Sequence, residues 1–330
     1  MKIVITGVNG FVGGCLANYF STKNYEITGI GRQPELAAFV NKKCEYIYAD
    51  ITKPLKIFKT DVVIHAAALA SDTANFDILY KSNVGGTQNV LNASFSASTF
   101  IQVSTSSVYN FNINASVEHE AAKNFDVLSG YGQTKFLAEQ KVLANENIRS
   151  KYILRPKAIY GINDRLILPR LLKFVKGNYL LLPKHITTKI SLTHIENFTA
   201  AVELCILKPQ HNKIYNVADD EVYALGDIIV NLVSTVTEKK LNVLNIPSCI
   251  WSSIISLNQI LIFNKDLSKF GSNQLTKYGI MDISAIKSEM GYVPKKKIFD
   301  SYREIAGWII SNGGWKKYLK QYESIAKARS

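Results

Sequence analysis

The chain has 330 residues, of which 47% are hydrophobic and 20% are charged. This length and composition exclude a largely disordered protein and fit one large domain or two coupled lobes. The formal net charge of +13 favours anionic small-molecule ligands, although a basic surface can also serve solubility alone. The sequence has no zinc-finger, RNA-recognition or basic-zipper pattern, so we expect no nucleic-acid partner.

The four cysteines, Cys15, Cys44, Cys205 and Cys249, have neither Cys-x-x-Cys nor metal-ligand spacing. This pattern predicts reduced thiols, a cytoplasmic location and no bound metal. The opening MKIVITG has only three consecutive apolar residues before Thr6, too few for the core of a signal peptide.

In chain order, β-branched runs alternate with segments of helical periodicity. The pattern predicts strand 2–6, helix 11–23, strand 25–31, helix 34–41, strands 44–51 and 61–68, helix 76–97, strand 99–109, helix 132–147 and strand 151–156. Such alternation indicates a parallel sheet covered by helices on both faces. The fold class we expect is α/β, with a Rossmann-type doubly wound sheet.

After Arg155 the alternation loosens. The remaining predicted elements are helix 168–178, a strand followed by a helix within 190–207, and strand 213–219. We therefore predict one domain from residues 1–155, to which 190–217 return, and a smaller mixed C-terminal lobe for substrate from 156–189 and 218–330.

The stretch TGVNGFVG, residues 6–13, lies where the first predicted strand turns into the first helix. In such a turn, Gly7 allows the tight bend, Gly10 lets a pyrophosphate approach the backbone, and Gly13 lets helix and strand pack closely. The N–H groups and the dipole at the helix start favour phosphate groups. The position of the motif predicts dinucleotide binding.

The residue after the second predicted strand bears on which dinucleotide binds. A carboxylate there would hold the ribose hydroxyl of NAD, but the sequence reads GIGRQPE, with Arg32 after the uncharged Gly31. A guanidinium suits a 2′-phosphate, so NADP(H) is favoured over NAD(H). In the alternative, Arg32 points to solvent or is neutralised by Glu35.

The stretch SGYGQTK, residues 129–135, places Tyr131 and Lys135 four positions apart, on the same face of a predicted helix. A buried ammonium favours the phenolate form of a nearby phenol, which suits acid/base chemistry between a hydroxyl and a carbonyl. The hydroxyl side chains of VSTSSVY, residues 103–109, follow a strand at its carboxyl end, where open α/β sheets bind ligands.

Together these motifs resemble the extended short-chain dehydrogenase/reductase superfamily, the NAD(P)-dependent epimerase/dehydratase family, which includes nucleotide-sugar epimerases, dehydratases and 3β-hydroxysteroid-type dehydrogenases. The resemblance covers nearly the whole chain. The motifs that carry it are TGxxGxxG at 6–13, ADI at 49–51, HAAA at 65–68, NVGGT at 83–87, STSSVY at 104–109, YxxxK at 131–135, LRPKAIYG at 154–161 and SLTHIENF at 191–198.

The resemblance implies roles for particular residues. Tyr131 would be the general acid/base, Lys135 would bind the nicotinamide ribose, Thr105 would supply the catalytic hydroxyl, and Asn83 would stabilise the active-site helix. The implied cofactor contacts are Gly7, Asn9, Gly10, Phe11, Val12, Gly13, Arg32, Asp50, Ile51, Ala66, Ala67, Tyr131, Lys135 and Pro156. The candidate substrate residues are Thr105, Ser106 and Lys189.

For the substrate, the basic charge and Lys189 favour a nucleotide sugar handled by a 4-reductase or epimerase. Ala158 stands where typical UDP-sugar 4-epimerases have an asparagine, and the RxGD arginine of those enzymes is missing. The alternatives are a 3β-hydroxysteroid-like dehydrogenase of an apolar secondary alcohol and a non-catalytic NADP-binding regulator.

Two further segments bear on partners. Residues 246–263 carry no charge, and residues 315–330 form a basic predicted helix with an aromatic face. We favour burial or docking of both segments over contact with a membrane surface. A homodimer is an expectation from the family resemblance.

Overall fold

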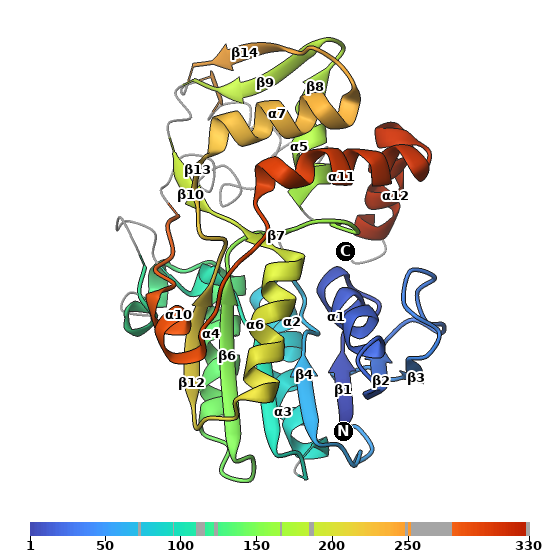
Figure 1. Cartoon of the computed structure of the whole chain (residues 1–330), viewed down its shortest axis with the longest axis vertical. Helices are drawn as coiled ribbons and strands as arrows, with labels where there is room; N and C mark the ends of the chain where they lie inside the picture. Colours follow the sequence, from blue (N-terminus) through green and yellow to red (C-terminus); the bar gives the residue numbers. More distant parts are fainter. Residues whose placement is uncertain are drawn as a thin grey trace.

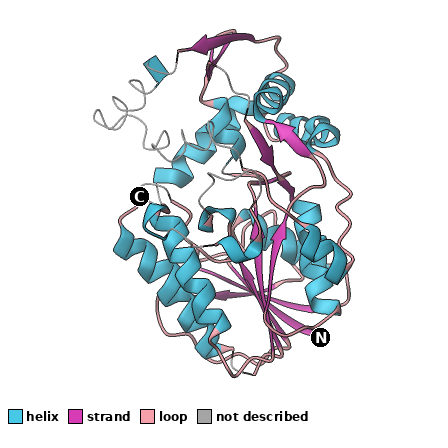
Figure 2. Ribbon diagram, turned by 90° about the vertical axis from the view of Figure 1, so that its left-hand side faces the viewer, coloured by secondary structure: helices cyan, strands magenta, loops and turns pink. Residues whose placement is uncertain are grey.

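The computed structural model of the chain describes residues 1–71, 74–94, 96–109, 116–121, 125–165, 167–184, 188–247, 250–251 and 279–327. A central sheet with helices on both faces forms one part of the molecule, and a smaller mixed lobe lies beyond the carboxyl ends of its strands (Figures 1 and 2). In open α/β folds, ligands bind outside the carboxyl ends of the strands.

The described part of the sheet has seven strands in the order β12-β6-β5-β4-β1-β2-β3, and all neighbouring pairs are parallel. The strands are β1 (Lys2–Thr6), β2 (Glu26–Gly31), β3 (Glu45–Tyr48), β4 (Val62–His65), β5 (Thr99–Val103), β6 (Ser150–Pro156) and β12 (Lys213–Val217). The predicted Rossmann-type fold is confirmed. The strand order reverses between β1 and β4, which places a crevice at their carboxyl ends.

Helices pack on both faces of this sheet because its strands are apolar on both sides. Ile3 and Ile5 of β1 join a core with α1 and α6, whereas Val4 between them joins a second core with α3 and α4. The helices of this part are α1 (Phe11–Ser21), α2 (Phe76–Tyr80), α3 (Gly86–Ala93), α4 (Gly130–Leu143), α6 (Ile195–Leu207) and α10 (Ser284–Met290). Its short turns are a π-helical turn (Lys81–Gly85) and 3-10 turns at Ser106–Val108, Glu118–Glu120 and Phe125–Val127.

The second lobe has a separate apolar core, in which Ile229 and Val233 of α7 pack with Ile305 and Ile309 of α11. Its helices are α5 (Ile167–Leu172), α7 (Leu225–Thr237), α11 (Ile298–Ser311) and α12 (Gly314–Lys327). Its strands are β7 (Ile159–Tyr160), β8 (Val175–Lys176), β9 (Tyr179–Pro183), β10 (Lys189–Ser191), β11 (Thr193–His194), β13 (Val222–Ala224) and β14 (Asn242–Ile246).

The domain boundaries remain a prediction. One helix, α10, packs with the large sheet and not with the lobe to which we assigned it. We assigned residues 218–330 to the substrate lobe, but Ile286 and Met290 of α10 are buried in the core of the large sheet. The apolar face of this short helix packs beside β12, which explains its position.

The predicted helix at 34–41 is wrong. This segment is a loop whose backbone pairs with two side-chain amides of α1 and the turn before it. Asn9 accepts from Ala37 N at 2.8 Å and donates to Glu35 O at 2.9 Å, while Asn18 donates to Phe39 O at 2.9 Å. These backbone groups are therefore taken up by amides and not by helical hydrogen bonds.

Two other predicted helices are altered. Helix 168–178 ends early, at Leu172, and the rest of the segment forms β8 and the turn into β9, where Gly177 has a positive φ of 62°. The long helix at 76–97 is interrupted by the π-helical turn and ends at Ala93.

The predicted docking of the C-terminal tail is confirmed. Tyr318 of α12 is buried, donates a hydrogen bond to the Asp164 carbonyl, and packs in the core of the second lobe with Trp315 at its edge. Most of the uncharged segment 246–263 lies outside the described residues. Among the described helices, none combines the length and apolarity needed to cross a bilayer.

A buried ion pair joins α4 to the sheet. Arg155 of β6 donates to both carboxylate oxygens of Glu139, at 3.0 Å and 2.5 Å, and both side chains are at most 1% exposed. Arg155 also donates to Tyr109 Oη at 3.0 Å, and Ser104 Oγ donates to Glu139. Because α4 carries Tyr131 and Lys135, this pair fixes the helix of the candidate site.

We expect Glu139→Gln to lower the free energy of unfolding by about 3–5 kcal/mol, because it leaves the Arg155 charge buried without its counterion. Denaturant unfolding monitored by circular dichroism measures this change. The control is Asp220→Asn, which breaks the exposed pair with Lys287 and should cost less than about 1 kcal/mol. Equal losses in the two variants would contradict the structural role of Glu139.

Candidate active site

The glycine turn between β1 and α1 is as tight as backbone contact allows. Gly7 has φ = 72°, and a Cβ built on it would lie 2.8 Å from the Ala67 Cα atom. A Cβ on Gly13 would lie 2.4 Å from the Gly7 carbonyl oxygen. Any side chain at these positions would therefore force β1, the chain after β4 and α1 apart.

This turn fits the phosphates of a dinucleotide. Helix α1 begins after Gly10, which has no side chain to cap it, and its first turn contains no acidic residue. The N–H groups at its start, including those of Phe11 and Val12, are therefore available to an anion. A carboxylate in this turn would have repelled the phosphates.

Asn9 lies in the same turn, but its side chain serves another purpose. In addition to Glu35 and Ala37, its amide donates to Tyr46 Oη at 3.2 Å, so it fastens the loop after β2 onto the glycine turn. The part of Asn9 left to a ligand is its backbone.

Arg32 and Asp50 lie at the end of β2 and just after β3, on the rim of the crevice. Arg32 is exposed, and the described ion pairs include none between it and Glu35. The pKa of Asp50 is below its usual value, chiefly because its carboxylate accepts from Thr52 N at 2.9 Å, with a smaller contribution from the Arg32 charge. Because Arg32 is exposed, its guanidinium is accessible to a phosphate group bound at this rim.

Ile51, Ala66 and Ala67 line the inner side of the same rim. The Ile51 side chain packs against Gly86 of α3, where an added Cβ would lie 2.7 Å from it. Ala66 and Ala67 follow β4 directly, are half-buried, and face Gly7. The predicted cofactor contacts from the glycine turn, β3 and β4 therefore lie along the carboxyl edge of the sheet.

A chain of hydrogen bonds runs beneath this rim. Thr6 Oγ1 lies 2.6 Å from Nδ1 of the fully buried His65, and His65 Nε2 lies 3.0 Å from Thr87 Oγ1. Thr87 donates to the Asn83 carbonyl at 2.6 Å. Burial, together with the Lys135 charge, lowers the pKa of His65 to about 3, so its ring stays neutral. The sequence places His65 in the HAAA motif, which predicts no role for its side chain.

Asn83, in the π-helical turn, links two parts of the site. Its side chain accepts from Leu69 N at 2.8 Å and donates to Thr134 Oγ1 at 3.1 Å. Thr134 in turn donates to the Tyr131 carbonyl at 3.0 Å. Asn83 therefore ties the chain after β4 to the first turn of α4.

Tyr131 and Lys135 lie one turn apart on α4, against the end of β5. Lys135 is 2% exposed, and its Nζ donates to the Val103 carbonyl at 2.7 Å. Burial lowers its pKa to about 8, against an opposing effect of Glu139. Tyr131 is half-buried. A buried cation therefore lies one helical turn from a half-buried tyrosine.

The hydroxyl side chains after β5 lie against the same helix. Thr105 Oγ1 accepts from Ser107 N at 3.1 Å, and Ser106 is buried. A Cβ on Gly132 would lie 2.2 Å from the Ser107 carbonyl oxygen, so glycine is what allows α4 to approach this turn. The structure brings Thr105, Ser106, Tyr131 and Lys135 to one edge of the sheet.

The two remaining predicted residues, Pro156 and Lys189, lie in different parts of the fold. Pro156 is buried at the end of β6 beside Val217 of β12. Lys189 is exposed on β10, in register with Ala224 of β13, and it has no described contact with Thr105, Tyr131 or Lys135.

Lys157 belongs to the LRPKAIYG stretch, whose pattern predicts no role for the lysine. It follows β6 at the carboxyl edge, is 6% exposed, and its pKa is lowered by burial to about 7. Gly279 makes room for its amine, since a Cβ there would lie 2.8 Å from Lys157 Nζ. The sequence signal for this buried amine is a lysine directly after a predicted strand, 151–156.

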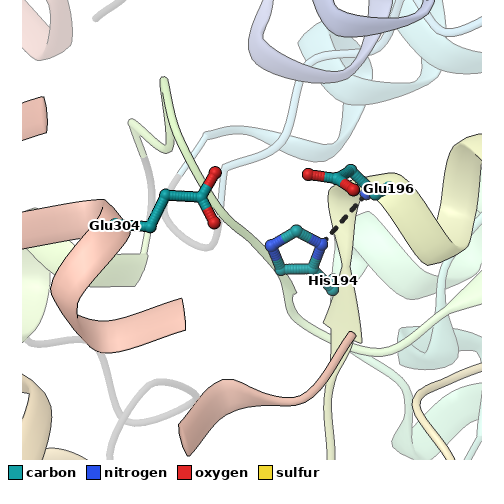
Figure 3. A group of neighbouring side chains, drawn as sticks. All are labelled: His194, Glu196 and Glu304. Carbon is teal, nitrogen blue, oxygen red and sulfur yellow. Dashed lines mark hydrogen bonds between the residues drawn. The ribbon is translucent and has the colours of Figure 1, made fainter. Parts of the chain in front are cut away.

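One cluster has the composition of a metal site. Ligand atoms of His194, Glu196 and Glu304 lie within 4.8 Å of one another (Figure 3). The ammonium of Lys296, however, lies 3.3 Å from Glu196 and 3.4 Å from Glu304. The cluster therefore already has a cation, as an ion-pair network between α6 and α11. That the protein binds no metal remains a prediction.

Comparison with known proteins agrees with this geometry. The model of the NAD dependent epimerase/dehydratase family matches residues 3–218. A 2-alkyl-3-oxoalkanoate reductase of Stenotrophomonas maltophilia is 25% identical, over 92% of this chain and 98% of its own. A 3 beta-hydroxysteroid dehydrogenase/Delta 5→4-isomerase of Mycobacterium tuberculosis is 26% identical, over 68% of this chain and 65% of its own.

Among solved structures, the UDP-glucuronic acid 4-epimerase of Bacillus cereus in complex with NAD is similar, with a TM-score of 0.74. It is 22% identical, and the match covers 94% of this chain and 99% of the epimerase. The fold and site define an NAD(P)-binding enzyme of the extended short-chain class, an oxidoreductase or epimerase. The chain belongs to the NAD dependent epimerase/dehydratase family.

We expect Gly132→Ala to lower the free energy of unfolding by about 1–3 kcal/mol, because the added methyl group overpacks α4 against the Ser107 carbonyl. Gly130→Ala is the matched control, since its Cβ would lie 3.4 Å from Leu79, an ordinary contact. Denaturant unfolding of both variants compares them. A Gly130 variant as unstable as the Gly132 variant would contradict the proposed close approach.

We expect the protein to lose stability as the pH falls from 6.5 towards 3, in part because His65 is neutral when folded and takes up a proton only on unfolding. In His65→Gln this part of the pH dependence should disappear, as measured by melting temperature at pH 7.5 and pH 5. His211→Gln, at an exposed position, should keep the wild-type dependence. Unchanged pH dependence in His65→Gln would contradict the neutral ring.

Proposed function

We propose that the protein transfers a hydride at a secondary alcohol or ketone carbon, with Tyr131 as the acid/base. The single observation that supports this most strongly is the buried Lys135 amine, held on the Val103 carbonyl one helical turn from Tyr131. A scaffold without catalysis would have no need of a buried cation beside a phenol. The non-catalytic alternative is therefore disfavoured.

The residues act as follows in this proposal. At pH 7 most Lys135 side chains are protonated, since the pKa is about 8, and the charge favours the phenolate form of Tyr131. Thr105 and Ser106 orient the substrate oxygen. In reduction the Tyr131 hydroxyl gives its proton to the carbonyl oxygen, and in oxidation the phenolate removes the proton from the alcohol. Bound NAD(P) supplies or accepts the hydride.

We further propose NADP(H) as the cofactor. The support is Arg32, which is exposed at the end of β2 and exerts its charge on Asp50 across the rim of the crevice. A 2′-phosphate on the ribose would add the anion that this guanidinium can pair with.

For the substrate we propose a ketone or secondary alcohol on an apolar skeleton, which the sequence analysis gave as the first alternative to the favoured nucleotide sugar. Ala158 packs against the apolar core of the second lobe, at the position where UDP-sugar 4-epimerases of the usual pattern have an asparagine. The reductase and steroid dehydrogenase relatives act on substrates of this kind, as their names state.

A nucleotide sugar is the second candidate. It is supported by the net charge of +13 and by the structural similarity to a UDP-glucuronic acid 4-epimerase. The predicted role of Lys189 in binding a nucleotide sugar has less support, because Lys189 is exposed on β10 and makes no described contact with Thr105, Tyr131 or Lys135.

We expect Tyr131→Phe to reduce turnover roughly 100- to 10,000-fold while NADPH binding changes little, because only the transferable proton is lost. The assay follows NADPH oxidation with 2-alkyl-3-oxoalkanoates, 3-ketosteroids and UDP-sugars in parallel. Tyr80→Phe, at an exposed position on α2, is the control and should keep full activity.

Turnover of the apolar ketones alone agrees with the proposed substrate class. Conversion of UDP-sugars alone would replace it with the second candidate. Undiminished turnover in Tyr131→Phe would contradict the role of the phenol.

We expect Arg32→Gln to weaken NADPH binding roughly 10-fold or more and to leave NADH binding unchanged, since the lost pair involves the 2′-phosphate alone. Fluorescence titration of the reduced cofactors measures both constants. Lys53→Gln removes another exposed cation near Asp50 and should have a smaller effect. Tighter binding of NADH than NADPH by the wild-type protein would overturn the assignment.

A further inference from the structure

Arg165 reaches from the second lobe to the glycine turn. Its Nη1 atom donates to the Asn9 carbonyl at 3.4 Å, and its guanidinium lies 4.9 Å from the centre of the Phe39 ring. Asn9 belongs to the turn before α1, and Phe39 packs on the first turn of α1 at Gly14. This single side chain therefore connects the two parts of the molecule at the phosphate-binding turn.

The backbone around Arg165 is fixed from several sides. Tyr318 of α12 donates to the Asp164 carbonyl, and the Asp164 carboxylate accepts from Leu168 N at 2.9 Å. On the other side, Cys15 of α1 contacts the Ile162 carbonyl, with Sγ at 3.9 Å. The backbone just before Arg165 is therefore anchored to α12, α5 and α1, which places its side chain next to the turn.

The charge of Arg165 is poorly balanced. Burial lowers its pKa, yet a guanidinium stays protonated in proteins. The groups that act on it most are Tyr318 and Cys15, both neutral at pH 7 because burial raises the pKa of each, that of Cys15 to about 12. The ion pairs of the described residues do not include Arg165. A partly buried cation of this kind is costly unless an anion joins it.

We propose that Arg165 binds the diphosphate of the dinucleotide and so closes the second lobe over the glycine turn. This inference rests on NAD(P) binding by the family and does not depend on which substrate is reduced. The two N–H edges of a guanidinium match phosphate oxygens, and its weak bond to one neutral carbonyl can be exchanged for charge-assisted bonds.

The diphosphate is favoured over the 2′-phosphate as the group bound. The hydrogen-bonded partner of Arg165 is Asn9, inside the turn whose neighbouring N–H groups begin α1. Arg32, which we assign to the 2′-phosphate, lies instead at the end of β2. The two arginines should therefore affect the two cofactors differently.

The test is titration of NADPH and NADH into Arg165→Gln, followed by cofactor fluorescence. We expect the Kd for both cofactors to rise by a similar factor, roughly 10- to 100-fold, because both carry the diphosphate. Phe39→Leu removes the ring but keeps the charge, and it should change each Kd by less than about 3-fold. Arg165→Lys should bind with a Kd between those of the wild type and the Gln variant.

Unchanged affinity in Arg165→Gln would overturn the proposal. A loss confined to NADPH would also overturn it, since the 2′-phosphate would then be the group bound. An equal loss of cofactor affinity in Phe39→Leu would also overturn it, because the contact between Arg165 and Phe39 would then act by positioning the loop and not through the charge. If the Gln variant fails to fold, the Lys variant replaces it as the test: a wild-type Kd for both cofactors, or a higher Kd for NADPH alone, would overturn the proposal. This test reads cofactor affinity in Arg165 variants, whereas the catalytic proposal is tested by turnover in Tyr131→Phe, so failure of one proposal is distinguishable from failure of the other.

Discussion

The close contact between α4 and the end of β5 is the constraint on which the rest of the site depends. Lys135 donates to the Val103 carbonyl, and Gly132 lets the helix meet the Ser107 carbonyl without a side chain between them. The hydroxyls of Thr105 and Ser106 and the phenol of Tyr131 share one edge only because of this approach. The buried Arg155–Glu139 ion pair joins the same helix, α4, to β6. Residues that stabilise the fold and residues proposed for catalysis are therefore neighbours on α4.

A second constraint acts at the cofactor end of the crevice. The backbone of Gly7 touches Ala67, and Asn9 fastens the loop after β2 through its amide. Arg165 adds a contact from the second lobe to the same turn. In the proposed role of Arg165, cofactor binding and the contact between the two parts of the molecule meet at this one turn. The coupling gives the second lobe a part in binding the dinucleotide as well as the substrate.

Much of this could be predicted from local pattern, and the exceptions have identifiable causes. Alternating strands and helices, the glycine turn and the Tyr131–Lys135 spacing depend on neighbours in sequence. The loop at 34–41 could not be predicted, because its hydrogen-bond partners Asn9 and Asn18 lie in another element. The role of Arg165 was hidden for the same reason, since its partner Asn9 is 156 positions away. Burial of Lys157 and His65 likewise depends on packing that no short motif encodes.

Titration of the nucleotide-free protein with NADPH, followed by cofactor fluorescence, tests the central claim most directly. The account predicts saturable binding of one NADPH per chain, displaced by NADP⁺, at the crevice formed by the glycine turn, Arg32 and α4. Absence of saturable binding for both NADPH and NADH would contradict it.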